Sequence, residues 1–111
     1  MKKITLFLMM TATQVAFAAP ALNAKEAATA AELAKGNGCL SCHALDEKIV
    51  GPAYSKVAAK YSDDKDAAAS LAQSIRNGSQ GKWGRIPMPA HGNMNSDDIN
   101  LLARWILTIQ K

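Results

Sequence analysis

Apolar residues recur at helical spacing along this chain, and no stretch alternates between apolar and polar positions as a β-strand does. The clearest helix is the C-terminal one, for which Asn95 or Ser96 is the predicted N-cap. Its apolar side chains follow the i, i+3, i+4, i+7 spacing of one buried face, and they are Leu102, Trp105, Ile106 and Ile109. The predicted fold class is all-α.

Three further helices are predicted upstream. An Ala-rich segment over residues 26–35 ends at Gly36-Asn37-Gly38, and a short helix follows through residues 54–61 with Pro52 in its first turn. A third helix covers residues 67–77 and ends at a glycine. The glycine- and proline-containing loop that follows it shows no strand pattern.

The first residues differ in character from the rest. Met1-Lys2-Lys3 precedes residues 4–17, which are uncharged and mostly apolar, and small residues follow. This order is typical of a secretory signal peptide, and the run is shorter than the roughly 20 residues that span a bilayer. We therefore expect residues 1–18 to be cleaved, with a cut after Ala24 as the alternative. Residues 19–111 would then be exported as a single domain, by default to the periplasm.

Composition and charge change this picture in two ways. The 111 residues are 49% hydrophobic but only 5% aromatic, so the core contains few large side chains and another component is expected to fill it. The formal net charge is +4, and losing Lys2 and Lys3 with the leader leaves 11 basic against 9 acidic residues, or +2. The basic balance is therefore no evidence for nucleic-acid binding.

The candidate chemistry lies in Cys39-Leu40-Ser41-Cys42-His43, the attachment pattern of c-type haem. Two thiols one helical turn apart can each bond a haem vinyl group, and the adjacent histidine then lies under the iron. Haem is also a large apolar plate that would fill a thin core. The alternatives are a disulfide, a thiol–disulfide redox site, and a zinc site with His91, which the divergent directions of Cys42 and His43 disfavour.

The sixth ligand position of a haem iron separates an electron carrier from an enzyme. An open position binds oxygen or peroxide, whereas a thioether closes it and raises the reduction potential. Met88 is the favoured ligand because Pro87 and Pro89 stiffen the backbone on both sides. Met94 is interpreted as a packing or surface residue, and His91 as part of a surface loop.

Seven segments in order along residues 31–111 resemble the small bacterial class I cytochromes c of the c-551/c-552 kind, also called c8. These segments are Cys39-Leu40-Ser41-Cys42-His43, Val50-Gly51-Pro52-Ala53, Asn77-Gly78-Ser79-Gln80-Gly81, Trp83-Gly84, Ile86-Pro87-Met88-Pro89, Ser96-Asp97-Asp98 and Trp105-Ile106-Leu107. The resemblance implies a class I cytochrome c fold, with four to five short helices wrapped around one covalently bound haem c.

The resemblance also implies roles for particular residues. The thioether donors would be Cys39 and Cys42. The axial ligands of the iron would be His43 and Met88. The carbonyl of Pro52 would accept a hydrogen bond from the second ring nitrogen of His43. Trp83 would donate its indole N–H to a haem propionate.

By the same resemblance the protein is a diffusible periplasmic electron carrier, a monomer and not an enzyme, that cycles between Fe(III) and Fe(II). The implied partners are an upstream quinol-oxidising complex and, downstream, a periplasmic nitrite reductase, a terminal oxidase or a cytochrome c peroxidase. Neither nucleic-acid binding nor membrane insertion of the mature protein is expected. The rival hypothesis is a haem peroxidase or ligand sensor with an open sixth position, for which His91 is the candidate acid–base group.

Two positions depart from the family pattern. Relatives often carry Asn, touching the ligand sulfur, where this chain has His91, and some carry Arg, pairing with a propionate, where it has Ser74. Arg76 or Arg85 is the predicted substitute for that arginine. A basic rim near the haem edge, which would speed encounter with acidic partners, is predicted from Lys35, Lys48, Lys82 and Arg85.

Overall fold

A computed structural model describes residues 21–111 and contains four α-helices and one short 3-10 helix in that range. In chain order the elements are α1 (Ala24–Gly36), η1 (Cys39–Ser41), α2 (Tyr54–Lys60), α3 (Ala67–Asn77) and α4 (Ser96–Ile106). No strand forms within residues 21–111, and the all-α prediction is confirmed. The predicted leader, residues 1–18, lies outside the described residues. Of the helices in the described range, none combines the length and apolar character needed to cross a membrane.

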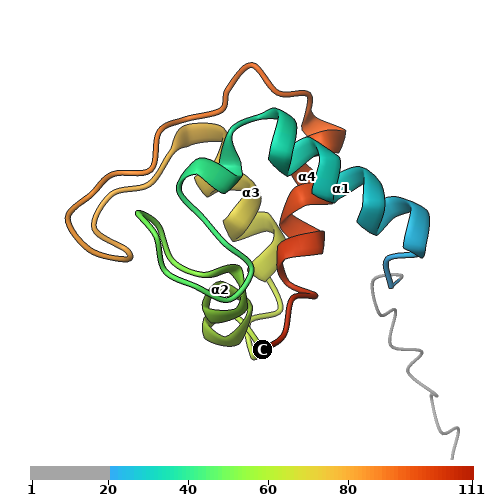
Figure 1. Ribbon diagram of the computed structural model, residues 1–111, viewed down its shortest axis with the longest axis horizontal. Coiled ribbons are helices and arrows are strands. Elements are labelled where there is room, and N and C mark those ends of the chain that lie inside the picture. The colour runs from blue at the N-terminus through green and yellow to red at the C-terminus, as the bar shows by residue number, and fades with distance from the viewer. Residues whose placement is uncertain (1–20) are drawn as a thin grey trace, which may run out of the picture.

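Helix α4 lies at the centre of the fold and contacts α1, α2 and α3 (Figure 1). Its buried face includes Ile99 and Leu102, which are the largest fully buried side chains of the described residues. Burying each of them contributes about 1.5–3 kcal/mol. Helix α1 meets α4 through Ala30 and Ala34, both fully buried, and these small side chains let the two helix axes approach closely.

Asparagine side chains begin the first and last helices. Asn23 forms a capping box with Glu26, in which each side chain bonds the other residue's backbone amide, so α1 begins two residues earlier than the Ala-rich pattern indicates. Asn95 accepts hydrogen bonds from the amides of Asp97 and Asp98, which confirms the predicted N-cap of α4.

Helix α2 has no side-chain cap, and backbone carbonyls take that role. The amide of Tyr54 donates to the carbonyl of Ala44 at 3.0 Å, and the amide of Ser55 donates to the carbonyl of Leu45 at 2.9 Å. The prediction that Pro52 lies in the first turn of this helix is wrong, because the helix begins at Tyr54 and Pro52 precedes its N-cap. The Pro52 carbonyl is therefore available to a partner outside the helix.

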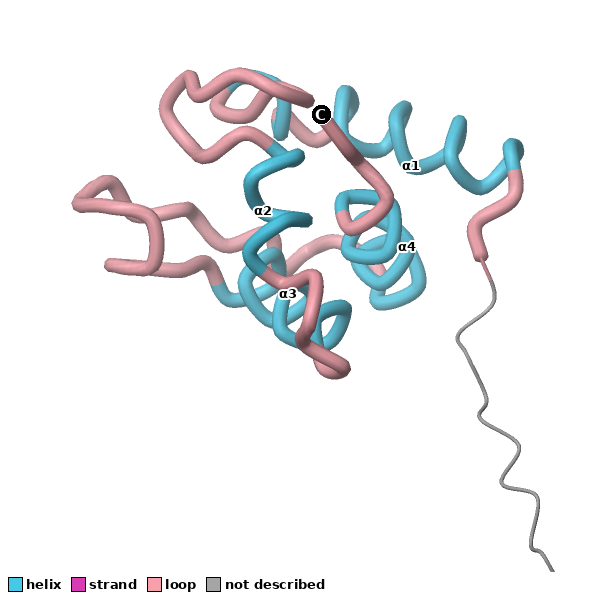
Figure 2. Tube along the Cα trace, turned by 90° about the horizontal axis from the view of Figure 1, so that it is seen from below, coloured by secondary structure: helices cyan, strands magenta, loops and turns pink. Residues whose placement is uncertain are grey.

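Two long loops lie on the side of the helices away from α1 (Figure 2). One connects η1 to α2, and the other connects α3 to α4. The second loop turns back on itself, because Ser79 and Met88 pair through two backbone hydrogen bonds of 3.1 and 2.8 Å (Figure 1). The sequence showed no sign of this pairing, since neither side of it alternates as a strand does.

Candidate functional site

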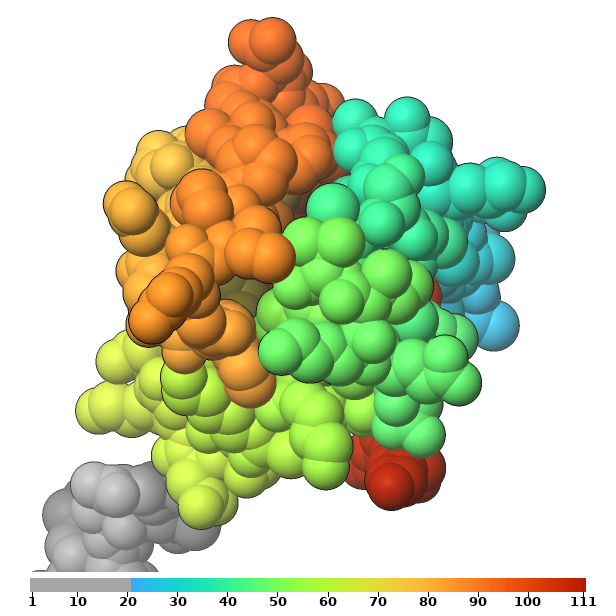
Figure 3. All heavy atoms as spheres, turned by 60° about the vertical axis from the view of Figure 1, so that its left-hand side comes forward, coloured from blue at the N-terminus to red at the C-terminus, as the bar shows by residue number. Residues whose placement is uncertain are grey.

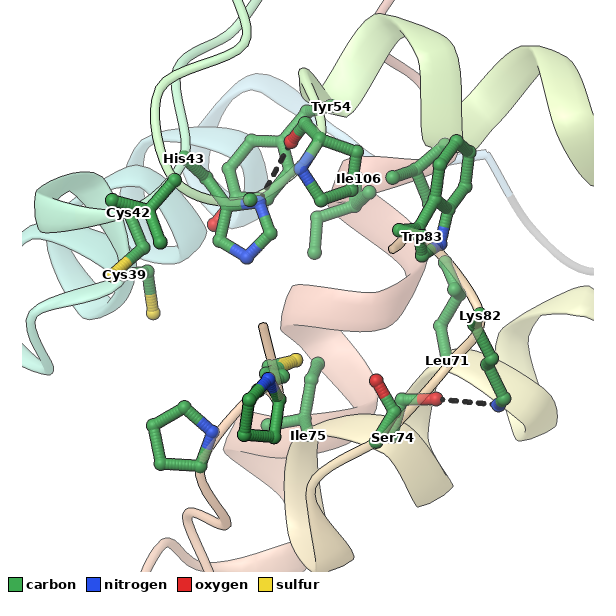
Figure 4. A pocket seen from close by; sticks show the side chains of 18 of the residues that line it. Cys39, Cys42, His43, Tyr54, Leu71, Ser74, Ile75, Lys82, Trp83 and Ile106 are labelled. Carbon is green, nitrogen blue, oxygen red and sulfur yellow. Dashed lines mark hydrogen bonds between the residues drawn. The ribbon is translucent and has the colours of Figure 1, made fainter. Parts of the chain in front are cut away.

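A pocket opens between these two loops, over α3 and α4. Residues 39–54 form one side, which we call the histidine wall, and residues 78–91 form the other, the methionine wall. Figure 3 shows the hollow between the green and orange segments to which these walls belong. Its inner surface is mostly apolar and includes Leu71 and Ile75 of α3 and Ile106 of α4 (Figure 4).

The cysteine motif winds into a single turn at the edge of the pocket. Gly38 precedes this turn with a left-handed backbone, at φ 74°. The carbonyl of Cys39 then accepts hydrogen bonds from the amides of both Cys42, at 3.2 Å, and His43, at 2.9 Å. As a result the two thiols and the imidazole all face the same pocket (Figure 4).

Three neighbours fix the imidazole ring of His43. Its Nδ1 lies 2.7 Å from the carbonyl oxygen of Pro52, the hydrogen bond that the resemblance implied (Figure 4). The ring of Tyr54 stacks on it, with centroids 4.9 Å apart and an interplanar angle of 18°. Gly51 lies so close that a β-carbon there would be 2.6 Å from His43 Cε1.

Backbone contacts position Met88 on the opposite wall. Its pairing with Ser79 holds the peptide groups on both sides of its Cα. Gly78, at φ 74°, passes so close that a β-carbon there would be 2.5 Å from the Met88 carbonyl oxygen. Met88 is half-buried, lines the pocket and packs against the hydrophobic core.

The interpretation of His91 as part of a surface loop is wrong. His91 is half-buried and lines the pocket, because its amide donates to the carbonyl of Ile75 at 2.9 Å and holds this residue against the end of α3. Its Nδ1 atom is fully buried and has no hydrogen-bond partner. Met94 packs against the core, which is one of the two roles expected for it.

The pocket also has a polar end, at residues 82–83 of the methionine wall. Trp83 lines the pocket there, and the ammonium of Lys60 lies 4.5 Å from its ring centroid. Lys82 Nζ donates to Ser74 Oγ at 3.0 Å (Figure 4). Of the four lysines and arginines predicted to form a basic rim, Lys82 alone lines the pocket.

Neither Arg76 nor Arg85, the predicted substitutes for an arginine at position 74, lines the pocket. The guanidinium of Arg76 donates to Ser96 Oγ at 3.0 Å, so it is held at the start of α4. Arg85 is exposed and is not part of the pocket lining. Arg76 points away from the pocket that Ser74 lines, because residues 74 and 76 of a helix point about 200° apart.

The alternatives for the cysteines receive no support from the site. Both cysteines are free thiols, and burial raises the pKa of Cys39, whereas a redox-active cysteine needs a lowered one. Within the described residues, no three side chains of His, Cys, Asp or Glu come together as a metal site. Burial also raises the pKa of Tyr54, so its phenol stays protonated.

The described aromatic residues gather around this pocket. Tyr54, Tyr61 and Trp83 line it, and Trp105 meets the Tyr54 ring edge-on at 5.7 Å. A pocket with apolar surfaces, two thiols and an imidazole on one wall and a thioether on the other fits a haem. The shortage of aromatic residues thus reflects a core whose few large rings surround a cofactor site.

Sequence reasoning missed three contributors to this site. Tyr54 and Gly51 both contact the His43 ring, and Lys60 covers Trp83. The only signal for Tyr54 was that the exported part of the chain contains few aromatic residues. Nothing in the sequence indicated Lys60, because its contact depends on how the loop after α3 returns to α2.

Comparison with known proteins gives consistent results. The family model named Cytochrome c matches residues 27–110. Cytochrome c-552 of Nitrosomonas europaea is 50% identical over 103 residues, which cover 92% of this chain and 100% of that protein. Cytochrome c-551 of Pseudomonas aeruginosa is 53% identical over 76 residues, covering 68% of this chain and 72% of that protein. The crystal structure of wild-type Nitrosomonas europaea cytochrome c552 aligns with a TM-score of 0.69 at 51% identity, over 72% of this chain and 99% of that one.

Proposed function

The chain belongs to the cytochrome c family as a small electron carrier with one covalently bound haem c, and on this premise we propose that His43 and Met88 are the axial ligands of its iron. The haem supplies a reversible one-electron change between Fe(III) and Fe(II). The residues described above account for how the chain would bind it, orient it and keep its iron coordinated.

Cys39 and Cys42 are the proposed attachment points. Each S–H would add across one haem vinyl group, with sulfur bonding one vinyl carbon and hydrogen going to the other, so the attachment would need no oxidant. The turn that brings both thiols to the same pocket supports this role. Covalent attachment also keeps a small domain from losing the plate that fills its core.

His43 is the proposed first axial ligand, and its hydrogen bond fixes the tautomer. A carbonyl oxygen can only accept, so Nδ1 must carry the proton that it shares with Pro52. In the neutral ring this tautomer leaves the lone pair on Nε2, which could then bind iron. The stacked Tyr54 ring restrains rotation of the imidazole about its ligating nitrogen.

Met88 is the proposed second axial ligand. A thioether is a weak ligand, so a backbone held by the Ser79 pairing and by two prolines reduces the entropy that coordination costs. A thioether from Met88 would leave no ligand position for oxygen or peroxide and would favour the reduced iron. These are the properties of a carrier that passes electrons on without binding a substrate.

We propose that the carrier acts in the periplasm after cleavage of residues 1–18. The capping box supports this site over a cut after Ala24, because the later cut would remove Asn23 and leave the first amides of α1 uncapped. Losing such a cap costs about 1 kcal/mol.

The proposed partners are one-electron redox proteins: a quinol-oxidising complex as donor, and a nitrite reductase, a terminal oxidase or a cytochrome c peroxidase as acceptor. Around the pocket, Val50 and Ile86 are 42% and 68% exposed, and Leu40 is 41% exposed. Small exposed apolar surfaces of this kind suit the brief, weak docking of redox partners by a monomer.

The observation that carries the proposal is the Nδ1–carbonyl hydrogen bond of a histidine whose two neighbouring thiols share its pocket. The test is an absorbance spectrum of the exported protein with a haem-stained gel. We expect covalent haem, a low-spin ferric spectrum with the iron–thioether charge-transfer band, and no carbon monoxide binding by the reduced form. A high-spin ferric spectrum would contradict methionine ligation.

A pair of matched variants assigns the ligand. Met88→Leu should abolish the charge-transfer band and open the reduced iron to carbon monoxide. Met94→Leu, which changes a core-packing methionine only six residues away, should leave both readouts as in the wild type. Loss of the band in Met94→Leu and its retention in Met88→Leu would reverse the assignment.

A further inference from the structure

Lys82 is the one lysine or arginine among the described residues that line the pocket, and no aspartate or glutamate lines it. The surrounding surface is mostly apolar, so this single ammonium sets the charge of its end of the pocket. A ligand that fits such a pocket is apolar over most of its surface and anionic where it reaches Lys82. Haem matches this description, because its propionate carboxylates extend from one edge of an apolar plate.

The ammonium is held in place by Ser74. Ser74 Oγ lies 3.3 Å from the carbonyl oxygen of Ser70, to which it donates, and it accepts from Lys82 Nζ at 3.0 Å. This chain of two hydrogen bonds, of which Figure 4 draws the one between Lys82 and Ser74, ties an exposed side chain to helix α3. An ammonium has three N–H donors, so two of them are left for another acceptor.

The backbone around Lys82 supports the same orientation. Gly81 precedes it with a left-handed φ of 78°, which turns the loop so that Lys82 and Trp83 both line the pocket. The titratable groups at this end are Lys82 on the loop, Lys60 at the end of α2 and Tyr61, the C-cap of α2, while α3 contributes the hydroxyl of Ser74. Lys60 covers the Trp83 ring rather than lining the pocket.

We propose that Lys82, positioned by Ser74, binds a propionate carboxylate of the haem and thereby raises the midpoint potential of the iron. The inference rests on the proposed function. A lysine–serine pair then takes the role that the sequence predicted for Arg76 or Arg85. Lys82 would affect the iron only through the carboxylate that it binds, and Ser74 is the positioning residue for Lys82.

The direction of the effect follows from charge. An anionic carboxylate near the iron favours Fe(III), and a cation paired with it offsets that preference. Removing the cation therefore lowers the midpoint potential. Because Lys82 is exposed at the pocket edge, solvent weakens the interaction. We expect a two- to tenfold change in the equilibrium constant for reduction, which is about 20 to 60 mV for one electron.

The test measures the midpoint potential as a function of pH in four variants. Lys82→Gln should lower the midpoint potential. The plot of this potential against pH bends where the propionate takes up a proton, and this bend should move to higher pH, because the carboxyl group loses the cation that favours its ionised form. Ser74→Ala should give a smaller change in the same direction. Lys82→Arg should restore both readouts. Lys25→Gln is the control, since it removes one positive charge on α1, outside the pocket.

The outcomes separate this inference from the proposed function. If Lys82→Gln shifts the potential no more than Lys25→Gln does, or leaves the bend in place, the inference is wrong while the carrier stands. All variants should keep covalent haem and the iron–thioether band. If the wild type lacks either feature, the proposed function fails and takes the inference with it.

Discussion

The two walls of the pocket are fixed in different ways. The histidine wall holds its side chain directly: a carbonyl, a stacked ring and a glycine all contact the His43 imidazole. The methionine wall instead holds the backbone of Met88, through the Ser79 pairing and the close passage of Gly78. A strong nitrogen ligand is thus oriented in advance, whereas a weak thioether ligand depends on a stiff chain.

Among these predictions, adding a methyl group at Gly51 should cause the largest loss of stability, because it would displace the His43 ring. In Gly51→Ala the new β-carbon would be 2.6 Å from His43 Cε1 and 2.9 Å from Nδ1, and moving the ring away would disturb its Pro52 hydrogen bond and its stack on Tyr54. We expect a loss of about 3 kcal/mol or more in the free energy of unfolding, with poor haem attachment. Denaturant unfolding and a haem-stained gel measure both.

Gly36→Ala is the matched control for that substitution. A β-carbon at Gly36 would meet no atom within 4 Å, although this residue, the last of α1, lies only three residues before the histidine wall. Its free energy of unfolding should stay within about 0.5 kcal/mol of the wild type. Equal effects of the two substitutions would show that Gly51 has no special relation to His43.

The equivalent change on the methionine wall is Gly78→Ala. It combines a left-handed φ of 74° with a β-carbon 2.5 Å from the Met88 carbonyl oxygen, so the Ser79–Met88 pairing must open. We expect a loss of about 2 to 3 kcal/mol and a weaker iron–thioether band, because the backbone that stiffens Met88 is displaced.

Gly81→Ala separates the cost of backbone strain at a positive φ from the cost of the contact with Met88. Gly81 has nearly the same φ, 78°, but nothing lies within 4 Å of its β-carbon position. It should cost only the backbone strain of about 1 kcal/mol and keep the band. If Gly81→Ala weakens the band as much as Gly78→Ala, strain in the loop rather than contact with Met88 is the cause.

The residues of both walls were only partly predictable from the sequence. The existence of the four helices and the N-cap at Asn95 depend on local spacing, which was enough to predict them, whereas the start of α1 and the place of Pro52 depend on cap and backbone contacts that the pattern does not show. The Ser79–Met88 pairing and the burial of His91 depend on where a long loop returns against α3, which no periodicity encodes. The position of Lys82 depends on the same return, which is why the sequence indicated Arg76 or Arg85 instead of Lys82.

Tyr54 offers a smaller test of the histidine wall. Tyr54→Leu keeps an apolar side chain but removes the ring that stacks on His43 and meets Trp105 edge-on. We expect a loss of about 2 kcal/mol in the free energy of unfolding and a less restrained His43 ring, seen as broader imidazole signals in NMR. Tyr54→Phe keeps the ring and should cost less than about 1 kcal/mol. A Phe variant as damaged as the Leu variant would assign the effect to the hydroxyl group.

His91 tests the methionine wall with the smallest expected effect. Its Nδ1 is buried without a partner, and such an atom costs about 1–3 kcal/mol unless the bound cofactor or its ligand supplies one. We therefore expect His91 to influence the surroundings of the Met88 sulfur, three residues before it in the same wall. His91→Asn replaces the imidazole with a shorter amide and should shift the equilibrium constant for reduction by less than tenfold, or under about 59 mV. The measurement is the midpoint potential, with Asn93→Ser, an exposed change in the same loop, as control. An unchanged potential would mean that the methionine wall acts on the iron only by holding the Met88 backbone, whereas the histidine wall acts through contacts with the ligand side chain itself.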